Sequence, residues 1–178
     1  HIIAMHSSPS FDPNQFVFGI SQDNWQLIRN NPMKPLVNKS LSGNYSPGST
    51  IKPIVALSAL ENEIVSSKFT VNCKGHKHPL ELYGQKYHCW KKEGHGYVSL
   101  KEAMKQSCDT YFYEVARLLG VDRLNVTAEK FGLGNKVLGK YFENEKKGLF
   151  PNTIWKKNNL GKGWVLGETL ITGIGQGY

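Results

Sequence analysis

A serine and a lysine three residues apart could act as a nucleophile and its base within residues 45–53, which read YSPGSTIKP. Pro53 has no backbone N–H, so a helix tolerates it only in the first turn, where that donor lacks a partner in any case. We therefore expect a helix to begin close to Ser49, after a turn in which Gly48 takes a conformation closed to other residues. Residues three apart in a helix share a face, which places Lys52 beside Ser49.

The surroundings of these two side chains indicate how they would react. The positive end of a helix stabilises negative charge on the Ser49 oxygen by about 0.3–1 kcal/mol. Apolar neighbours should leave Lys52 poorly hydrated, and desolvation disfavours the charged form of an amine. An uncharged Lys52 could then accept the proton of Ser49. The alternative is a serine that only caps the helix and a lysine that reaches back into solvent.

Hydrophobic periodicity and helix signals predict the elements that position this pair. Residues 2–5 are typical of a buried strand, residues 9–48 of a long polar connection, and residues 133–167 of a loop. We expect helices over residues 51–64, from the capping box Ser99-Leu-Lys-Glu102 onward, over 109–119 with Asp109 as candidate N-cap, and over 122–131. The segment 69–97 has little helical periodicity and should be irregular.

The cysteines and one histidine could form a metal site in that irregular segment. The four candidate ligands are Cys73, Cys89, His95 and Cys108. A set of three cysteines and one histidine is typical of a closed, tetrahedral structural zinc site, although the spacing is not that of a zinc finger. A bound zinc would contribute folding free energy directly and would fix residues 73–97 beside the helix that follows.

The same residues leave other arrangements open. Cys73 and Cys89 could form a disulfide and leave the third cysteine free, or all three could be unpaired thiols. His88 could replace His95 as a ligand, but its neighbour Cys89 would crowd the same ion. His76 and His78 are expected at the surface.

Length and charge limit the class of protein. The chain has 178 residues, 39% of them hydrophobic, and a net charge of +8. This suits one domain, and no stretch approaches the roughly 18 apolar residues of a membrane-spanning helix. The basic residues are scattered and no nucleic-acid-binding motif accompanies them, so we expect a solvated surface and no nucleic acid partner. Both ends lie within patterns, so we expect that they are cut and that an anchor could lie upstream.

The stretch YSPGSTIKP closely resembles the Ser-x-x-Lys motif of the penicillin-recognising serine enzymes. Two further stretches, IIAMHSSPSFDPN and PLVNKSLSGNYSPGST, look like the segments that precede this motif in penicillin-binding transpeptidases. Two others, YHCWKKEGHGYVSLKEAMKQSCDTYFYEVARLLGVDRL and GIGQGY, look like the elongation-type class B group of Gram-negative bacteria, the penicillin-binding protein 2 group. The resemblance covers nearly the whole chain.

This resemblance assigns roles to four residues. Ser49 matches the acylated serine and Lys52 the general base. The second family motif, Ser-x-Asn, falls on Ser107-Cys-Asp109, where Ser107 would relay a proton between Lys52 and the leaving group. Asp109 stands in place of asparagine and could pair with Lys52 or cap its helix. The third motif, Lys-Thr-Gly, does not occur in the sequence, so the resemblance implies a partial transpeptidase domain without the anchor, the pedestal or that motif.

The resemblance also implies a fold and an activity. The family fold is of the α+β class, a five-stranded antiparallel sheet flanked by helices, incomplete here. The implied activity is peptidoglycan D,D-transpeptidation of D-alanyl-D-alanine stem peptides during cell elongation, with β-lactams acylating Ser49. The chemistry would need no cofactor. Zinc would be structural, and some elongation-type relatives carry a metal at matching places.

The same resemblance places the protein at the periplasmic face of the inner membrane, beside a membrane glycosyltransferase partner. Two other functions remain open from the sequence. A β-lactamase-like hydrolase shares Ser-x-x-Lys but must deacylate quickly. A zinc-stabilised, non-catalytic module that senses β-lactams is compatible with the missing third motif.

Overall fold

A computed structural model describes residues 2–178, which fall into two compact units. One unit consists of the chain up to Tyr45 together with Lys136–Gly148, and the other of Ser46–Asn135 together with Leu149–Tyr178. Within the described residues no helix is long and apolar enough to cross a membrane.

The first unit holds short helices joined by loops. They are the 3-10 turns η1 (Pro13–Phe16) and η4 (Gly139–Tyr141) and the helices α1 (Gln22–Arg29) and α2 (Lys39–Ser42). The α1 helix was not expected within residues 9–48, although Ser21 caps it by accepting a hydrogen bond from the Asn24 amide at 3.3 Å. The expected strand at residues 2–5 is wrong. Ile3 is fully exposed there, and among the described residues no neighbouring strand pairs with this segment, so its apolar pattern has no ladder to join.

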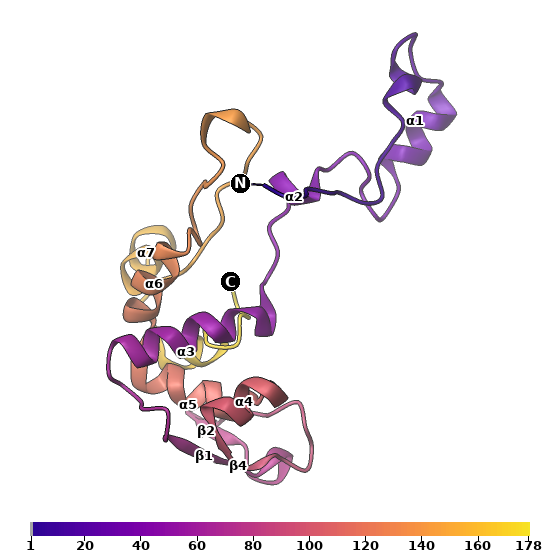
Figure 1. Ribbon diagram of the computed structural model, residues 1–178. Coiled ribbons are helices and arrows are strands. Elements are labelled where there is room, and N and C mark those ends of the chain that lie inside the picture. The colour runs from indigo at the N-terminus through magenta and orange to yellow at the C-terminus, as the bar shows by residue number, and fades with distance from the viewer. Residues whose placement is uncertain (1) are drawn as a thin grey trace. The chain divides into compact units, whose positions relative to one another are not determined.

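The second unit is built around one buried helix, α5 (Asp109–Leu119). The other helices of this unit are α3 (Lys52–Glu61), α4 (Leu100–Gln106), α6 (Val121–Lys130), α7 (Thr153–Leu160) and α8 (Leu166–Thr172). Both α3 and α8 pack directly on α5, and Figure 1 shows α3 beside it. Tyr111, Phe112 and Val115 of α5 are completely buried, so this helix lies at the centre of the hydrophobic core of the second unit.

The expected helices of this unit are confirmed, with one shorter than predicted. Ser99 caps α4 as expected, accepting a hydrogen bond from the Glu102 amide at 3.5 Å. The α3 helix ends at Glu61, because Glu63 adopts a left-handed conformation with a φ of 56°. Residues 133–167 were expected to be loop but contain α7, which Asn152 caps and Gly161 ends.

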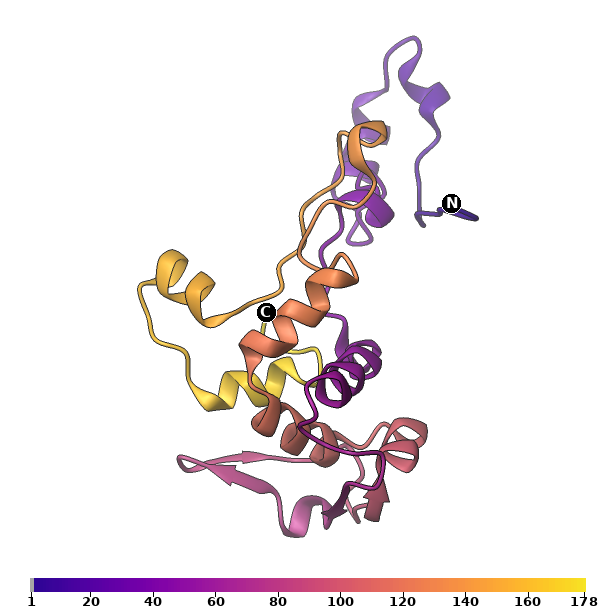
Figure 2. The same cartoon turned by 60° about the vertical axis from the view of Figure 1, so that its left-hand side comes forward.

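The strands form two small antiparallel ladders. β1 (Thr70–Cys73) pairs with β4 (Gly96–Ser99), and β2 (Leu80–Leu82) pairs with β3 (Gln85–Tyr87) in a hairpin that Figure 2 shows clearly. The mixed α+β class is as expected. The expected five-stranded sheet is not formed within residues 2–178, where the ladders have two strands each. The β1–β4 pair matters for function, since it brings Cys73 opposite Gly96 and so next to His95.

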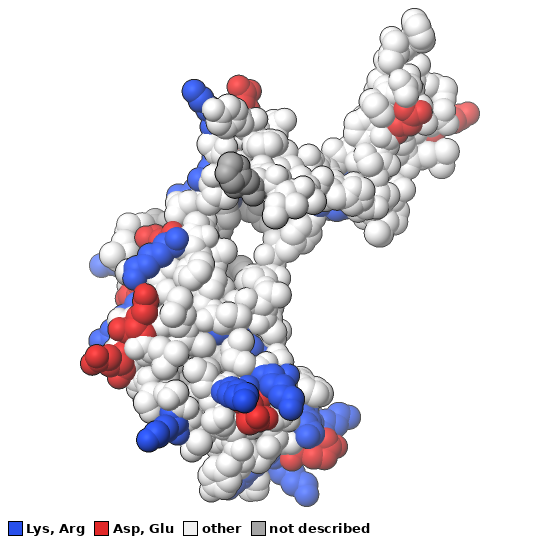
Figure 3. Space-filling view, in the orientation of Figure 1, with Lys and Arg blue, Asp and Glu red and all other residues white. Residues whose placement is uncertain are grey.

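Charged side chains of both signs are interspersed on the face drawn in Figure 3. The net charge of +8 is therefore not gathered into one basic surface on this face. This distribution fits the expectation of a solvated surface.

Candidate active site

Ser49 lies in a 3-10 turn, η2 (Gly48–Ile51), that runs directly into α3. Gly48 has a φ of 56°, the left-handed conformation expected of it, and Pro53 lies in the first turn of α3 as predicted. Ser49 is exposed to solvent, whereas Ile51, two residues on, is buried. The turn therefore presents one hydroxyl at the surface of a packed helix.

Lys52 is buried, with 2% of its surface exposed, and its amine has three hydrogen-bond acceptors. Nζ donates to Asp109 Oδ1 at 2.7 Å, to the Ser107 carbonyl oxygen at 2.9 Å and to Ser107 Oγ at 3.0 Å. It also lies 5.4 Å from the ring centre of Phe112. Three acceptors match the three N–H bonds of a lysine amine, so every donor of this buried group has a partner.

Ser107 connects the buried amine to the exposed serine. Its Oγ donates to Ser49 Oγ at 3.0 Å and accepts from Lys52 Nζ at 3.0 Å. Ser107 has a φ of 52° and a ψ of 44°, at the end of α4, where glycine is the usual residue. The next amide, of Cys108, closes the turn onto the Ala103 carbonyl at 2.9 Å. This strained backbone aims the hydroxyl at Ser49.

Asp109 pairs with Lys52 and does not cap its own helix. Cys108 is the N-cap residue of α5, so the prediction of Asp109 as N-cap is wrong. Its second carboxylate oxygen, Oδ2, accepts a hydrogen bond from the Trp90 amide at 3.0 Å. The alternative in which Lys52 reaches back into solvent does not hold either, since its amine is enclosed by Ser107 and Asp109.

The hydrogen bonds between Ser49, Ser107 and Lys52 can carry a proton. The sequence suggested a direct transfer from Ser49 to Lys52, which the structure does not show. Among the described residues no hydrogen bond joins Lys52 to Ser49, and the connection runs through Ser107. The distance from Ser49 Oγ to Ser107 Oγ and that from Ser107 Oγ to Lys52 Nζ are each 3.0 Å, within the range for proton transfer along hydrogen bonds. The site joins an exposed hydroxyl, a second hydroxyl and a buried, ion-paired amine in one hydrogen-bonded row.

The loop after α8 supports the serine turn from behind. The Gly48 amide donates to the Gly175 carbonyl at 2.9 Å. Gly175 has a φ of 73°, and a side chain on it would collide with the backbone of Gly48. The GIGQGY stretch therefore packs closely against the serine turn.

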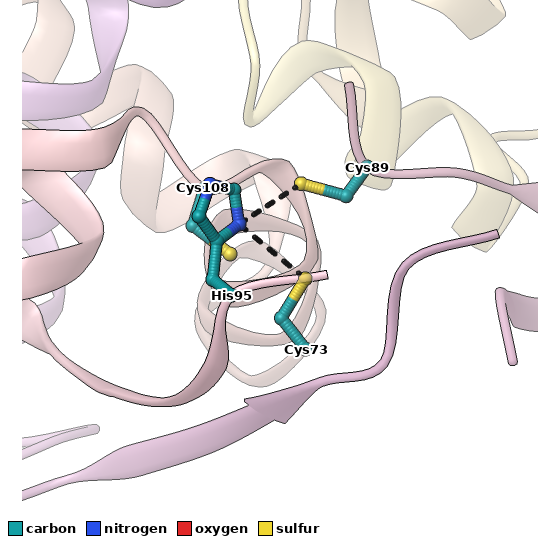
Figure 4. A group of neighbouring side chains, drawn as sticks. All are labelled: Cys73, Cys89, His95 and Cys108. Carbon is teal, nitrogen blue, oxygen red and sulfur yellow. Dashed lines mark hydrogen bonds between the residues drawn. The ribbon is translucent and has the colours of Figure 1, made fainter. Parts of the chain in front are cut away.

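Three cysteines and His95 gather next to this site, because Cys108 directly follows Ser107 in the chain (Figure 4). The ligand atoms of Cys73, Cys89, His95 and Cys108 all lie within 4.8 Å of one another. His95 Nδ1 lies 3.5 Å from the sulfurs of both Cys73 and Cys89. A zinc ion with ordinary bond lengths would separate a sulfur and a nitrogen ligand by about 3.6 Å, so the donor set fits a tetrahedral ion.

The thiols of this cluster are free, and their proton affinities differ. The interaction between the Cys89 and Cys108 thiols lowers the pKa of Cys89 well below its usual range and, together with burial, raises the pKa of Cys108. The Cys73 thiol donates to the Thr110 hydroxyl oxygen at 3.3 Å. All three cysteines are unpaired, so the Cys73–Cys89 disulfide is not formed.

The histidines divide as the sequence predicted. His95 belongs to the cluster, and its Nε2 is buried without a partner among the described residues. His76, His78 and His88 are exposed, and the rings of His76 and His88 lie 4.7 Å apart. His88 therefore does not replace His95.

Comparison with known proteins decides the family. The sequence profile described as "Penicillin binding protein transpeptidase domain" matches residues 1–178. The chain belongs to this transpeptidase family. The peptidoglycan D,D-transpeptidase MrdA of Acinetobacter baumannii is 42% identical over 176 residues, and that of Escherichia coli K12 is 40% identical over 179 residues. Each match covers 99% of this chain but only 26% and 28% of those relatives, so the chain spans about a quarter of their length.

Solved structures of the family have the same fold. Pseudomonas aeruginosa PBP2 in complex with WCK 5153 superposes with a TM-score of 0.87 at 44% identity, over 97% of this chain and 39% of that one. PBP2 of Helicobacter pylori, in complex with MreC, gives a TM-score of 0.86 at 37% identity, over 97% of this chain and 31% of that one. The transpeptidase fold expected from the sequence is thereby confirmed.

Sequence reasoning missed two residues of this candidate site. Trp90 contacts both Asp109 and the Ser107 carbonyl, but it is not among the residues to which the sequence assigned a role. Phe112 faces the Lys52 amine. Its apolar position on α5 predicted burial, but nothing in the local pattern indicated what it would face. For Trp90 the available signal was its place directly after Cys89, a candidate metal ligand.

Proposed function

We propose that this chain is the part of a peptidoglycan D,D-transpeptidase that carries the acylated serine, in an enzyme that crosslinks stem peptides during cell elongation. One observation carries the proposal. The exposed Ser49 hydroxyl is joined to the buried Lys52 amine through Ser107, in two steps of 3.0 Å each. Membership of the transpeptidase family and the MrdA relatives support it.

In the proposed acylation, Ser49 Oγ attacks the carbonyl carbon of the penultimate D-alanine. A carbon–oxygen bond forms and the carbon–nitrogen bond to the terminal D-alanine breaks. The Ser49 proton passes by way of Ser107 to an uncharged Lys52, and a proton returns along the same chain to the departing amine. Proton transfer within the Lys52–Asp109 pair, whose atoms lie 2.7 Å apart, provides that uncharged amine.

In the proposed deacylation, the amine of a neighbouring stem peptide attacks the acyl carbonyl carbon. The bond from that carbon to Ser49 Oγ breaks, and Ser49 recovers its proton. Water in place of that amine would give the carboxypeptidase product. A β-lactam would react as the donor does, through opening of its ring amide. The acyl group would then remain on Ser49, because its amine stays tethered.

We also propose that Cys73, Cys89, His95 and Cys108 hold a structural zinc ion. The support is the donor set, its separations close to those of a tetrahedral site, and the Thr110 hydroxyl on a ligand sulfur. Bound zinc supplies folding free energy and no reaction step. These residues would hold the loop 74–95 against Cys108, the neighbour of Ser107.

The wider setting is proposed by analogy with relatives. The Helicobacter pylori structure pairs PBP2 with MreC, and another neighbour, 33% identical with a TM-score of 0.79, is described as a peptidoglycan synthase complex that coordinates polymerisation and crosslinking. We propose that the parent protein works with a membrane glycosyltransferase, at the periplasmic face of the inner membrane.

Labelling with fluorescent penicillin tests this function on the parent protein. We expect a long-lived adduct in the wild type and none in Ser49→Ala. Rapid loss of the label with release of opened penicillin would instead indicate a hydrolase. Cells whose crosslinking is unchanged when only the Ser49→Ala protein is present would indicate a non-catalytic sensing module.

A further inference from the structure

Trp90 binds, with its two N–H groups, the same two groups that the buried lysine binds. Its backbone N–H donates to Asp109 Oδ2 at 3.0 Å, while Lys52 donates to Oδ1 of the same carboxylate at 2.7 Å. Its indole Nε1 donates to the Ser107 carbonyl at 3.1 Å, and Lys52 donates to that same oxygen at 2.9 Å. The indole also contacts the Gln106 carbonyl at 3.1 Å.

The placement of Trp90 is not explained by burial. Of its surface, 62% is exposed, which is unusual for a residue with so much apolar area to hide. Trp90 directly follows Cys89, and its ring lies edge-on to that of His95 at 5.4 Å. Two members of the cysteine–histidine cluster thus fix both its backbone and its ring.

We infer that Trp90 is a positioning residue that connects the cysteine–histidine cluster to the proton relay of Ser107. This inference rests on the proposed function of Ser49. Ser107 has a left-handed backbone that a non-glycine residue keeps only when its surroundings enforce it. The indole N–H fixes the direction of the Ser107 carbonyl, and with it the direction of the Ser107 hydroxyl toward Ser49. The backbone N–H fixes the carboxylate that holds Lys52.

The contribution of the Trp90 indole N–H can be measured apart from that of its aromatic ring. A neutral hydrogen bond of this kind stabilises by an amount that corresponds to about a 2–10-fold change in rate when it acts on the transition state. Losing the indole N–H while keeping an aromatic ring should therefore slow acylation within that range. Because Trp90 does not contact the acyl donor in this account, the binding of penicillin before acylation should not change.

The experiment uses the parent protein in its metal-loaded form and measures the acylation rate constant and the prior binding constant for a penicillin separately. Trp90→Phe and a variant carrying 3-benzothienylalanine at position 90 both lack the N–H, and the second keeps the two-ring shape. Trp25→Phe, in α1 of the other unit, is the matched control. Zinc content and Tm are measured on every variant.

We expect both position-90 variants to acylate about 5-fold more slowly, with zinc content, Tm and binding constant as in the wild type and with Trp25→Phe unchanged. Wild-type acylation rates in both variants would overturn the inference. A wild-type rate in the benzothienylalanine variant alone would also overturn it, since the two-ring shape and not the N–H donor would then matter. A slower rate accompanied by loss of zinc would overturn it as well. A wild-type protein that is not acylated at Ser49 would refute the proposed function itself, which is a separate outcome.

Discussion

Asp109 Oδ1 lies 2.7 Å from Lys52 Nζ, in a place where the lysine is almost fully buried and the carboxylate nearly so. An ion pair in such a place is costly to desolvate and costly to break, because removing one partner leaves a buried charge uncompensated. The carboxylate of Asp109 balances the charge of the Lys52 ammonium and keeps that group next to Ser107. It also joins α3 to α5, so the site and the core of the second unit are held by the same contact.

Replacing Asp109 with asparagine should therefore affect both folding and reaction. We expect Asp109→Asn to lower the free energy of unfolding by about 3 kcal/mol, since the Lys52 ammonium loses its counter-charge. Glu114→Gln is the control on the same helix. Glu114 pairs with Arg117 at 2.6 Å in a more exposed place, so its loss should cost less than about 1 kcal/mol. Urea denaturation of the transpeptidase domain measures both, and equal effects would contradict a buried pair.

Substitutions of Ser107 should affect the stability of the fold and the rate of acylation differently. Ser107→Ala and Ser107→Gly both remove the relay hydroxyl, but only glycine relieves the left-handed backbone. We expect both to slow acylation by penicillin by about 100-fold, the lower end of what general acid–base catalysis contributes. Glycine should be more stable than alanine by about 1 kcal/mol. A glycine variant that reacts at the wild-type rate would rule out the relay, and equal stabilities would rule out the strain.

Sequence rules of short range predicted the start of α3 and the cap of α4. Pro53 can occupy only the first turn of a helix, and the Ser99 capping box satisfies amides within three residues of itself. These signals act locally, so they hold whatever the rest of the fold does. The pairing of Ser49 with residues more than fifty positions later came from the family resemblance, not from any pattern in the chain.

The features that the sequence did not predict depend on distant partners. The α7 helix has clear caps, but Lys156 points inward from it to Glu168 at 2.6 Å and interrupts its apolar face. Residues 2–5 have the pattern of a strand and lack a paired neighbour among the described residues. Trp90 has its role only because the loop after Cys89 passes over Asp109.

The close approach of Gly175 to the serine turn can be tested with a matched pair of glycines. Gly175→Ala should slow acylation of Ser49 by about 10-fold, because its new methyl group would displace Gly48. Gly161→Ala introduces the same unfavourable φ, at 64°, where no atom lies within 4 Å of the new methyl group. It should cost about 1 kcal/mol of stability and leave acylation unchanged. Equal rates in the two variants would remove Gly175 from the support of the serine turn.

The metal proposal predicts one zinc ion per chain in the native protein. Cys89→Ser and His95→Ala should each lose most of it, and His88→Ala should retain it, because His88 is exposed outside the cluster. At free zinc a hundred times the Kd, the loss corresponds to about 2.7 kcal/mol of stability. Elemental analysis and thermal denaturation measure these effects. Native protein purified without chelators that contains no zinc would contradict the proposal.

Mass spectrometry of the parent protein after exposure to benzylpenicillin tests the central claim most directly. If a proton relay through Ser107 makes the Ser49 hydroxyl reactive, the folded protein gains the mass of one penicilloyl group. Peptide mapping then places that group on Ser49. Folded protein that stays unmodified, or that carries the group on Ser46 or Ser107 instead, would contradict this account.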